Sequence, residues 1–341
     1  MISMSKYLLM LNSFYSINGG LLVKIIDFNS ADEAINVFYG GNAGSKEAMI
    51  YNSGVWMIKY PKTTRDLKNP QQSYTTSPLS EYIGSRIFQS LGIPVHETIL
   101  GTKKNKIVVA CKDFTREINT KGSIELRRLL IPFHDLKNTF MSSDLDSYSG
   151  SGSETLITEV LDTIKGQRDL EQSLLMEERF WDMFVIDAFI GNNDRNNGNW
   201  GLLVDLVTNV TSLAPVYDNG NSFFNKRGLA QMETRLDNES LIQEDAYKTM
   251  VSAYKFEGLD QEGHNIKPYE YIRNSDEVMC HKALRRFVSQ VNMAEIRDII
   301  QEIPESYRGL AIMPEIQKEF YLRILEERMK ISRHIYNELH L

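Results

Sequence analysis

The sequence predicts an α+β protein with two lobes, a β-rich N-terminal lobe and a mainly helical C-terminal lobe. Short β-branched and aromatic runs fill residues 1–115 around one helical pattern. Helical periodicity dominates residues 170–341. The chain has 341 residues, enough for two lobes that each enclose a core. We therefore expect an N-terminal lobe over residues 1–115 and a C-terminal lobe over residues 116–341.

The first elements are predicted to be strands. The runs "LLVKIIDF" (21–28) and "VWMIKYP" (55–61) are apolar and bounded by turn residues. Between them, "YGGNAGSKEAMIYNSG" (39–54) holds a glycine-rich loop, a further short strand and an Asn-Ser-Gly turn.

A helix is predicted next, within "TTSPLSEYIGSRIFQSLGIPV" (75–95). Ser77 suits the N-cap, Pro78 the first helical position and Gly92 the C-terminal cap. Its buried stripe repeats every four residues, at Ile83, Ile87 and Leu91. The nearly continuous apolar run that follows, "KNKIVVACKDF" (104–114), predicts a central strand.

The remainder is predicted to be mostly helical. "SGSGSE" (149–154) breaks a region, 116–165, that we interpret as a variable insertion. A long apolar helix is expected over 170–191, then a hairpin over 200–220, then helix after helix from about residue 240. The charged stretch "EERMKISR" (326–333) is expected to be a solvated helix face, and Trp56, Trp181 and Trp200 to be core.

Composition excludes several classes of protein. The net charge of −7 argues against a general nucleic-acid binder, so we expect no direct DNA binding. The two cysteines fit no disulfide framework or zinc spacing, which favours a reducing, cytoplasmic setting. No segment has the length of a membrane span, so no membrane association is expected.

The loop "GNNDRNNGNWGLL" (191–203) carries a single acid, Asp194, among asparagines and glycines. A predicted hairpin follows and ends at a second acid, in "YDNG", so Asp194, Asn199 and Asp218 should meet on two loops joined by one ribbon. Phosphoryl transfer needs a carboxylate that orients the attacking hydroxyl and an Asn and an Asp that hold Mg²⁺. The step of five from Asp194 to Asn199 matches the D-x-x-x-x-N spacing of kinase catalytic loops.

The N-terminal lobe offers the other parts of a kinase site. Lys59 ends the strand "VWMIKYP", and Glu81 lies on the following helix, where it could hold the lysine in an ion pair. The glycine-rich stretch "GGNAG" (40–44) precedes the lysine strand and is not a Walker A motif. The order of these parts along the chain predicts a nucleotide-dependent phosphotransferase.

The segment "GNNDRNNGNWGLL…LAPVYDNG" resembles the signature of HipA-like serine/threonine kinases. The likeness is closest to their compact branch, the cell-translocating kinase A (CtkA) type, and covers roughly residues 37–340. Four further stretches resemble that branch: "ILGTKKNKIVVACKDFT", "MIKYP", "SEYIGSRIFQSLGI" and "RFWDMFVIDAFIGN". The resemblance implies a two-lobed protein-kinase-like fold and phosphorylation of protein Ser or Thr with ATP and Mg²⁺.

The resemblance also implies roles for individual residues. Asp194 would be the catalytic acid, Asn199 and Asp218 the magnesium ligands, and Lys59 the phosphate-binding lysine paired with Glu81. The nucleotide would further contact the glycine-rich loop and an adenine hinge, through Gly40, Gly41, Gly44, Ser45, Lys46, Ala110, Cys111 and Lys112. Members of the family can autophosphorylate a serine near the glycine-rich loop, and Ser45 is the candidate here.

Two features depart from the family. Only 39 residues precede Gly40, so target choice and antitoxin contacts do not carry over from longer HipA toxins. The position two after the catalytic acid, often His in the family, is Asn196, which leaves Arg195 or Lys46 to supply charge at the γ-phosphate.

Two alternative functions therefore stay open. One is a catalytically weak nucleotide-binding module that acts by protein contact. The other is a metal-dependent hydrolase built on Asp187, Asp194, Asp205 and Asp218. In the kinase interpretation Asp187 is expected to be a buried structural acid or a helix cap on the preceding helix. The resemblance leaves the protein substrate open. It implies that a small antitoxin could be a partner. The expected location is cytoplasmic, with export as an effector as the alternative.

Overall fold

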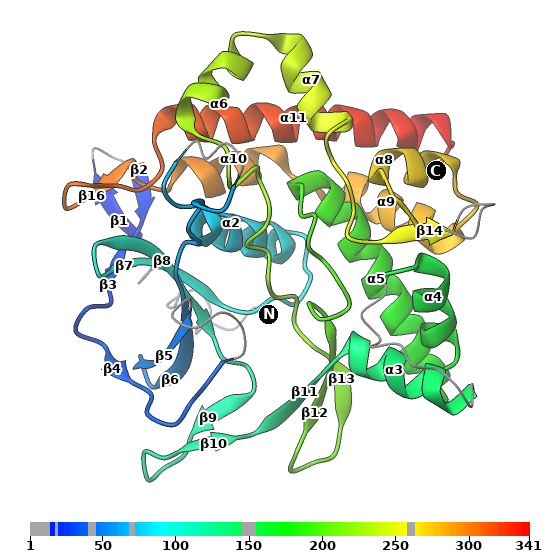
Figure 1. Ribbon diagram of the computed structural model, residues 1–341, viewed down its shortest axis with the longest axis horizontal. Coiled ribbons are helices and arrows are strands. Elements are labelled where there is room, and N and C mark those ends of the chain that lie inside the picture. The colour runs from blue at the N-terminus through cyan, green and yellow to red at the C-terminus, as the bar shows by residue number, and fades with distance from the viewer. Residues whose placement is uncertain (1–13, 18–19, 40–45, 68–71, 145–154, 258–262) are drawn as a thin grey trace.

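The structure is a computed structural model that describes residues 14–17, 20–39, 46–67, 72–144, 155–257 and 263–341. A β-rich lobe built mainly from the N-terminal part lies beside a lobe of helices that ends in the long helix α11 (Figure 1). The predicted two-lobed α+β fold is confirmed. The boundary at residues 115 and 116 stays a prediction.

The centre of the N-terminal lobe is a six-stranded sheet in the order β3-β7-β8-β6-β5-β4. Its strands are β3 (Ile26–Asp27), β4 (Asp32–Glu33), β5 (Lys46–Tyr51), β6 (Gly54–Lys59), β7 (Thr98–Lys103) and β8 (Lys106–Lys112). As predicted from its apolar run, β8 is central, with antiparallel partners β6 and β7 on its two sides. A separate hairpin precedes the sheet, β1 (Phe14–Ile17) with β2 (Gly20–Val23).

Helix α2 (Ser77–Ser90) packs on β7 and β8 and carries Glu81 in its first turns. Its predicted caps are confirmed only at the C-terminal end. Gly92 has a φ of +74°, the left-handed conformation that ends helices, but Ser77 is already helical and the N-cap is Thr76. Pro78 lies in the first turn, as expected from its fixed φ.

The expected hairpin is present as β12 (Gly201–Asp205) and β13 (Thr211–Leu213). The region interpreted as a variable insertion supplies a third strand of this ribbon, β11 (Arg128–Pro132), which pairs Pro132 with Gly201 and Arg128 with Asp205. The same region forms β9 (Arg116–Ile118), β10 (Ile124–Leu126), α3 (Phe133–Asp144) and α4 (Ile157–Lys165). The ribbon therefore fixes the position of the loop before β12, which carries Asp194, relative to the segment after β13, which carries Asp218.

Helix α5 (Leu170–Ile190) forms the middle of the C-terminal lobe. Asp169 caps its start by accepting a hydrogen bond from the Gln172 N–H, and Gly191 ends it with a φ of +73°. The later helices are α6 (Leu229–Leu236), α7 (Glu239–Tyr247), α8 (Pro268–Asn274), α9 (Val278–Gln290), α10 (Met293–Gln301) and α11 (Glu315–Glu338). Two hairpins interrupt the expected run of helices, β14 (Lys255–Glu257) with β15 (Gly263–Asn265) and β16 (Ser306–Tyr307) with β17 (Leu310–Ala311).

The main hydrophobic core continues through both lobes. It joins side chains of α2 and β8 to those of α5, and the three tryptophans are buried as predicted. The stretch 326–333 of α11 does not form the expected solvated face, because Arg328 is only 1% exposed. Among the described residues, no helix is long and apolar enough to cross a membrane.

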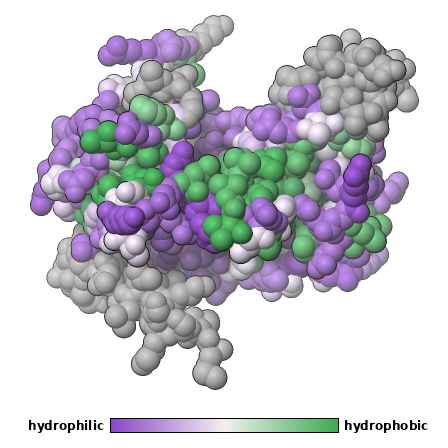
Figure 2. Space-filling view, turned by 90° about the horizontal axis from the view of Figure 1, so that it is seen from below, coloured by the Kyte–Doolittle hydropathy of each residue, from purple (hydrophilic) through white to green (hydrophobic). Residues whose placement is uncertain are grey.

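Hydrophobic side chains gather across the face of the molecule seen from below (Figure 2). This is the side on which Figure 1 places the ends of the ribbon β11–β13. The exposed apolar side chains of that ribbon and its approaches are Leu126, Leu129, Leu206, Val207 and Val210.

Candidate active site

Lys59, at the end of β6, makes two ion pairs at the junction of the lobes. Its Nζ lies 2.8 Å from Glu81 Oε2 and 2.8 Å from Asp218 Oδ1. The expected Lys59–Glu81 ion pair is therefore present. Glu81 is buried, with 1% of its side chain exposed, whereas 42% of the Asp218 side chain is exposed. One carboxylate is thus a fixed anchor for the lysine, and the other is open to a ligand.

The protonation states of these groups follow from the cluster. Burial would raise the pKa of Glu81, but the charge of Lys59, with a contribution from His96, outweighs it and holds that pKa well below its usual range. Lys59 lowers the pKa of Asp218. Burial opposes the charge on Lys59, but Asp218 and Glu81 raise its pKa well above the usual value. All three groups are charged at neutral pH.

His96 contacts the Glu81 oxygen that does not bind Lys59, and no sequence pattern predicted this contact. Its Nε2 lies 2.9 Å from Glu81 Oε1, and both side chains are almost fully buried. The backbone N–H of Asn219 donates to the same oxygen at 3.1 Å. Glu81, His96 and Cys111 place ligand atoms within 4.8 Å of one another. Because Glu81 already pairs with Lys59 and burial raises the pKa of the Cys111 thiol, we do not assign a metal to this group.

Asp194 lies in the loop between α5 and β12, held by side-chain amides. Asn192 Oδ1 accepts from the Asp194 N–H at 3.1 Å, and Asn199 Nδ2 donates to the Asp194 carbonyl at 2.6 Å. Asn196 Nδ2 donates to the carboxylate itself, at 3.2 Å from Oδ1. Short amides can replace backbone partners in a tight loop, which explains the many asparagines. Asn199 Oδ1 accepts no hydrogen bond from the described residues and is available to a cation.

Arg195 connects the two loops of the site through all five of its N–H donors. It donates to both Asp187 carboxylate oxygens, from Nε at 2.9 Å and from Nη2 at 3.2 Å. Nη1 donates to the carbonyl of Asn199 at 3.1 Å and to that of Tyr217, and Nη2 also donates to Asn219 Oδ1. Arg195 is 2% exposed. The suggestion that Arg195 supplies charge at the γ-phosphate is therefore wrong. Asp187 is the buried structural acid that the sequence predicts.

The backbone at Asp218 is held in an unusual conformation. Its φ of +61° lies in the left-handed region, which residues other than glycine rarely adopt. Its neighbours are fixed on both sides, since Arg195 bonds the Tyr217 carbonyl and Glu81 accepts from the Asn219 N–H. Gly84 of α2 packs against this loop so closely that an added Cβ would lie 2.8 Å from Asn219 Cβ. The sequence motif identified Asp218 but not this support.

Lys46 is a second cation of the site. It begins β5 directly opposite Lys59 in the sheet register. Burial lowers its pKa, and the nearby charge of Lys59 lowers it further. The other predicted contacts of the glycine-rich loop, Gly40, Gly41, Gly44 and Ser45, lie outside the described residues.

The predicted adenine hinge needs a correction. Ala110 and Cys111 lie inside the sheet, between β6 and β7, where the strand ladders use their backbone groups and both residues are buried. The structure therefore disfavours them as adenine contacts. Lys112 ends β8, and the chain leaves the sheet through Asp113 and Phe114. The Phe114 ring lies 5.8 Å from that of Tyr217, the neighbour of Asp218.

The four carboxylates of the hydrolase alternative do not converge. Asp187 is committed to Arg195. Asp205 lies at the far end of β12, where it pairs with Arg127 at 3.0 Å and accepts turn N–H groups. That leaves Asp218, which pairs with Lys59, and Asp194, on the loop that Arg195 joins to the Asp218 loop. Two carboxylates without the other two give no structural basis for a multi-carboxylate metal centre.

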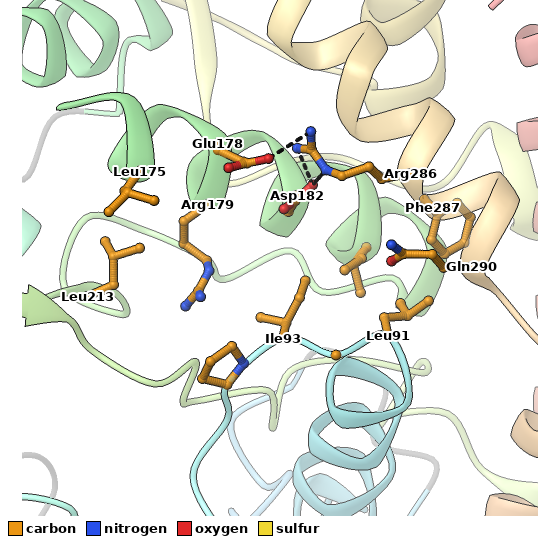
Figure 3. A pocket seen from close by; sticks show the side chains of 13 residues that line it. Leu91, Ile93, Leu175, Glu178, Arg179, Asp182, Leu213, Arg286, Phe287 and Gln290 are labelled. Carbon is orange, nitrogen blue, oxygen red and sulfur yellow. Dashed lines mark hydrogen bonds and ion pairs between the residues drawn. The ribbon is translucent and has the colours of Figure 1, made fainter. Parts of the chain in front are cut away.

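A cavity of about 240 Å³ lies away from this cluster, between the end of α2 and helices α5 and α9 (Figure 3). Of its four charged side chains, three pair with one another, and the fourth, Arg179, donates to the Ala214 carbonyl at 3.3 Å. Arg286 lies 2.9 Å from Glu178 and 2.7 Å from Asp182, and Figure 3 shows these three side chains turned toward one another. The cavity contains none of the predicted site residues.

Comparison with known proteins supports the kinase interpretation. Residues 43–255 match the family of the HipA-like C-terminal domain. The serine/threonine-protein kinase CtkA of Helicobacter pylori is 34% identical over 303 residues, which cover 89% of this chain and 85% of that protein.

Solved structures agree in fold. The crystal structure of the proinflammatory kinase CtkA of Helicobacter pylori matches with a TM-score of 0.76 and 32% identity, over 93% of this chain and 100% of that one. HipA from the Shewanella oneidensis toxin–antitoxin complex with HipB and operator DNA matches with a TM-score of 0.51 and 11% identity. That match covers 98% of this chain and 73% of the other, and it carries information on the fold alone.

Proposed function

Because the chain belongs to the family of proteins with a HipA-like C-terminal domain, we propose that it is a serine/threonine protein kinase that uses ATP and Mg²⁺. The observation that carries the proposal is Lys59 held at 2.8 Å from both Glu81 and Asp218. Kinases hold their phosphate-binding lysine between a helix glutamate and the metal-binding aspartate region in this way.

Each side chain has a task that its surroundings permit. Lys59, oriented by Glu81, neutralises charge on the phosphates, with Lys46 as a second cation across the strand pair. The Asp194 carboxylate orients the acceptor hydroxyl and takes up its proton. A bond forms from the hydroxyl oxygen to the γ-phosphorus as the bond to the β,γ-bridging oxygen breaks, and ADP leaves. Arg195 is a positioning residue, because it acts only through the loops that it joins.

The ligands proposed for magnesium fit its chemistry. Asp218 offers a partly exposed carboxylate, and Asn199 offers a side-chain carbonyl oxygen whose NH₂ group is anchored on Asp194. Both are hard oxygen donors, and Mg²⁺ commonly takes one or two such ligands besides water and phosphate. When bound, Mg²⁺ would neutralise charge on the phosphate oxygens.

The adenine is proposed to contact the segment that leaves β8. The N–H groups of Lys112 and Asp113 already donate to the carbonyls of Glu97 and Val55, each at 2.9 Å. The groups proposed to bond the adenine are therefore the carbonyl oxygens of this segment and the peptide group of Phe114. This shifts the proposed hinge from Ala110 and Cys111 to Lys112–Phe114. Ser45 stays the proposed autophosphorylation residue.

The exposed apolar side chains on the ribbon end suit a protein acceptor. Large exposed apolar patches on otherwise polar surfaces commonly mark protein contacts. The identity of the substrate and a small antitoxin partner remain proposals, and co-purification from the native source tests both.

The experiment that tests the proposal follows transfer from γ-labelled ATP in a magnesium titration. Wild-type protein is compared with Asp218→Asn, because asparagine tolerates the left-handed backbone at this position. Asp205→Asn, the same change on strand β12, is the matched control. We expect transfer that requires Mg²⁺, is lost in Asp218→Asn and persists in Asp205→Asn. Equal rates in wild type and Asp218→Asn would overturn the assignment.

One observation favours a second candidate, a nucleotide-binding module with weak catalysis. Asn196 places a neutral amide on the Asp194 carboxylate, where the family often has histidine. Tight ATP binding by wild type without transfer to itself or to any protein in its native extract would favour this alternative.

A further inference from the structure

A second cavity, of about 430 Å³, lies beside the catalytic loop. Its walls come mainly from the loop after α5, from the stretch 221–227 that follows Asp218, from α6, from the turn after α7 and from α11. Lys226, Arg227 and Arg328 line it, and none of the described residues that line it is acidic. The mechanism above uses none of these cations.

Arg328 is the unusual member of the group. Arg328 is 1% exposed. Its guanidinium donates to two carbonyls at helix ends, Phe189 at 3.1 Å and Ala246 at 3.3 Å, and lies over the Phe224 ring. Nη2 donates to no atom of the described residues. Burial lowers the pKa of Arg328 to about 10, so the group is still charged at neutral pH. Helix-end carbonyls carry only partial charge, so this buried cation lacks a full counter-charge.

The charge of Asp245 acts on Arg328, but this carboxylate is already paired with two other arginines. Asp245 is shared by Arg227, through both carboxylate oxygens, and by Arg235 at 2.5 Å. Two arginines on one carboxylate leave this side of the cavity positive even before Lys226 and Arg328 are considered. The cavity of Figure 3 differs, because its Arg286 is neutralised by two acids.

The same cavity contacts both functional loops. Asn193, next to Asp194, accepts a hydrogen bond from Asn221 Nδ2, and both residues line the cavity. Asn225 Nδ2 donates to the Gly220 carbonyl at 2.5 Å and so holds the turn after Asp218. A ligand here would touch the segments that carry Asp194 and Asp218.

We propose that this cavity is a second, non-catalytic site that binds a phosphoryl group, with Arg328 and Lys226 as its cationic ligands. A guanidinium edge and an ammonium match a phosphate dianion, and the amides add neutral donors. The volume lies within the range of small-ligand pockets and exceeds the needs of a lone ion, which favours a phosphorylated side chain. That this side chain is a product of phosphorylation by this protein rests on the proposed function, whereas anion binding does not.

The test measures binding in full-length Asp194→Ala protein, so that no transfer occurs. Calorimetry compares a phosphoserine peptide, its unphosphorylated form and inorganic phosphate at constant ionic strength. We expect the phosphoserine peptide to bind and its unphosphorylated form not to bind. Lys226→Gln and Arg328→Lys should each weaken the binding by about tenfold, the usual value of one charge-assisted contact.

Lys330→Gln, an exposed cation on the same helix, is the matched control and should leave binding unchanged. Lys59→Met removes a phosphate-binding cation of the catalytic site. Binding that survives Lys226→Gln but is lost in Lys59→Met would place the anion in the catalytic site and overturn the proposal. Absence of binding by both phosphate and phosphopeptide would overturn it as well. Binding of phosphate alone would keep the anion site and reject a phosphorylated side chain as its ligand.

If Arg328→Lys does not fold, Lys226→Gln carries the test, because Lys226 is exposed and its loss leaves no buried group unpaired. If wild-type protein transferred no phosphate but the Asp194→Ala protein still bound the anion, the result would count against the proposed function and not against this site.

Discussion

Removal of Lys59 should destabilise the active-site cluster, because this cation pairs with two carboxylates. Lys59→Met leaves Glu81 buried without its cation, and breaking a buried pair costs about 3–5 kcal/mol. Glu81 keeps the Asn219 N–H and the contact with His96, so we expect the lower limit, about 3 kcal/mol. The pair with Asp218 adds little, because that carboxylate is 42% exposed. For a chain of 341 residues the melting temperature should fall by about 4 °C.

A double-mutant cycle isolates the ion pair. Urea unfolding of wild type, Lys59→Met, Glu81→Gln and the double variant should give a coupling free energy of about 2 kcal/mol. Transfer activity should fall about 100-fold or more in Lys59→Met, because a charge at the phosphates is lost. A coupling below about 0.5 kcal/mol would refute the reasoning, since the two residues would then act independently.

The pH dependence of the cycle has a defined sign. The pKa of Glu81 is lowered on folding, so its ionised form stabilises the protein at every pH above its unfolded value of 4.5. That contribution is lost as the pH falls below this value. The stability difference between wild type and Glu81→Gln should therefore be constant at neutral pH and shrink in acid, and a difference that grows in acid would contradict the assignment.

Three further predictions concern the supports of the site. Arg195→Lys should destabilise the protein by about 3 kcal/mol, measured by urea unfolding, because lysine cannot reproduce five donors in one plane. Gly84→Ala should lower the transfer rate more than the stability, because its Cβ would meet Asn219 at 2.8 Å and displace the loop of the metal-binding acid. Cys111 and Cys280 are buried with raised pKa values, so neither should react with a thiol reagent until the protein unfolds.

Each of these has a control or a contrary outcome. Gln89→Ala, at an exposed position of the same helix, should leave transfer unchanged and so separates helix propensity from the clash at Gly84. If Arg195→Lys were as stable as wild type, the five hydrogen bonds of Arg195 would not contribute to stability as predicted. Rapid modification of one thiol in the native protein would mean that its part of the core opens readily.

The parts of the site that follow from local pattern could be predicted from the sequence. The Asp194 loop, the hairpin and the "YDNG" motif that ends it lie close together in the chain. Their spacing follows from the reaction that their side chains carry out. The pairing of Lys59 with Glu81 followed from their places on a strand and the next helix. Element order was predictable for the same reason, because each strand or helix shows its own period.

The errors arose where the direction of a side chain decides its role. Arg195 follows the catalytic acid, but the turn aims it into the core toward Asp187. Arg328 lies in a charged stretch of α11, yet tertiary packing buries it under the end of α5. Ala110 was placed at the hinge, although neighbouring strands on both sides occupy its backbone. His96 carried no signal, because its partner is fifteen residues away on another element.

The most direct test of the central claim compares nucleotide binding with phosphoryl transfer in Asp194→Asn. The substitution keeps the size of the side chain and removes the carboxylate that orients the acceptor hydroxyl. ATP affinity in the presence of Mg²⁺ should stay within about twofold of wild type, because the phosphate-binding residues are intact, while the transfer rate should fall by on the order of 10²–10³. Transfer at the wild-type rate in Asp194→Asn would contradict the assignment of this carboxylate and, with it, the proposed mechanism.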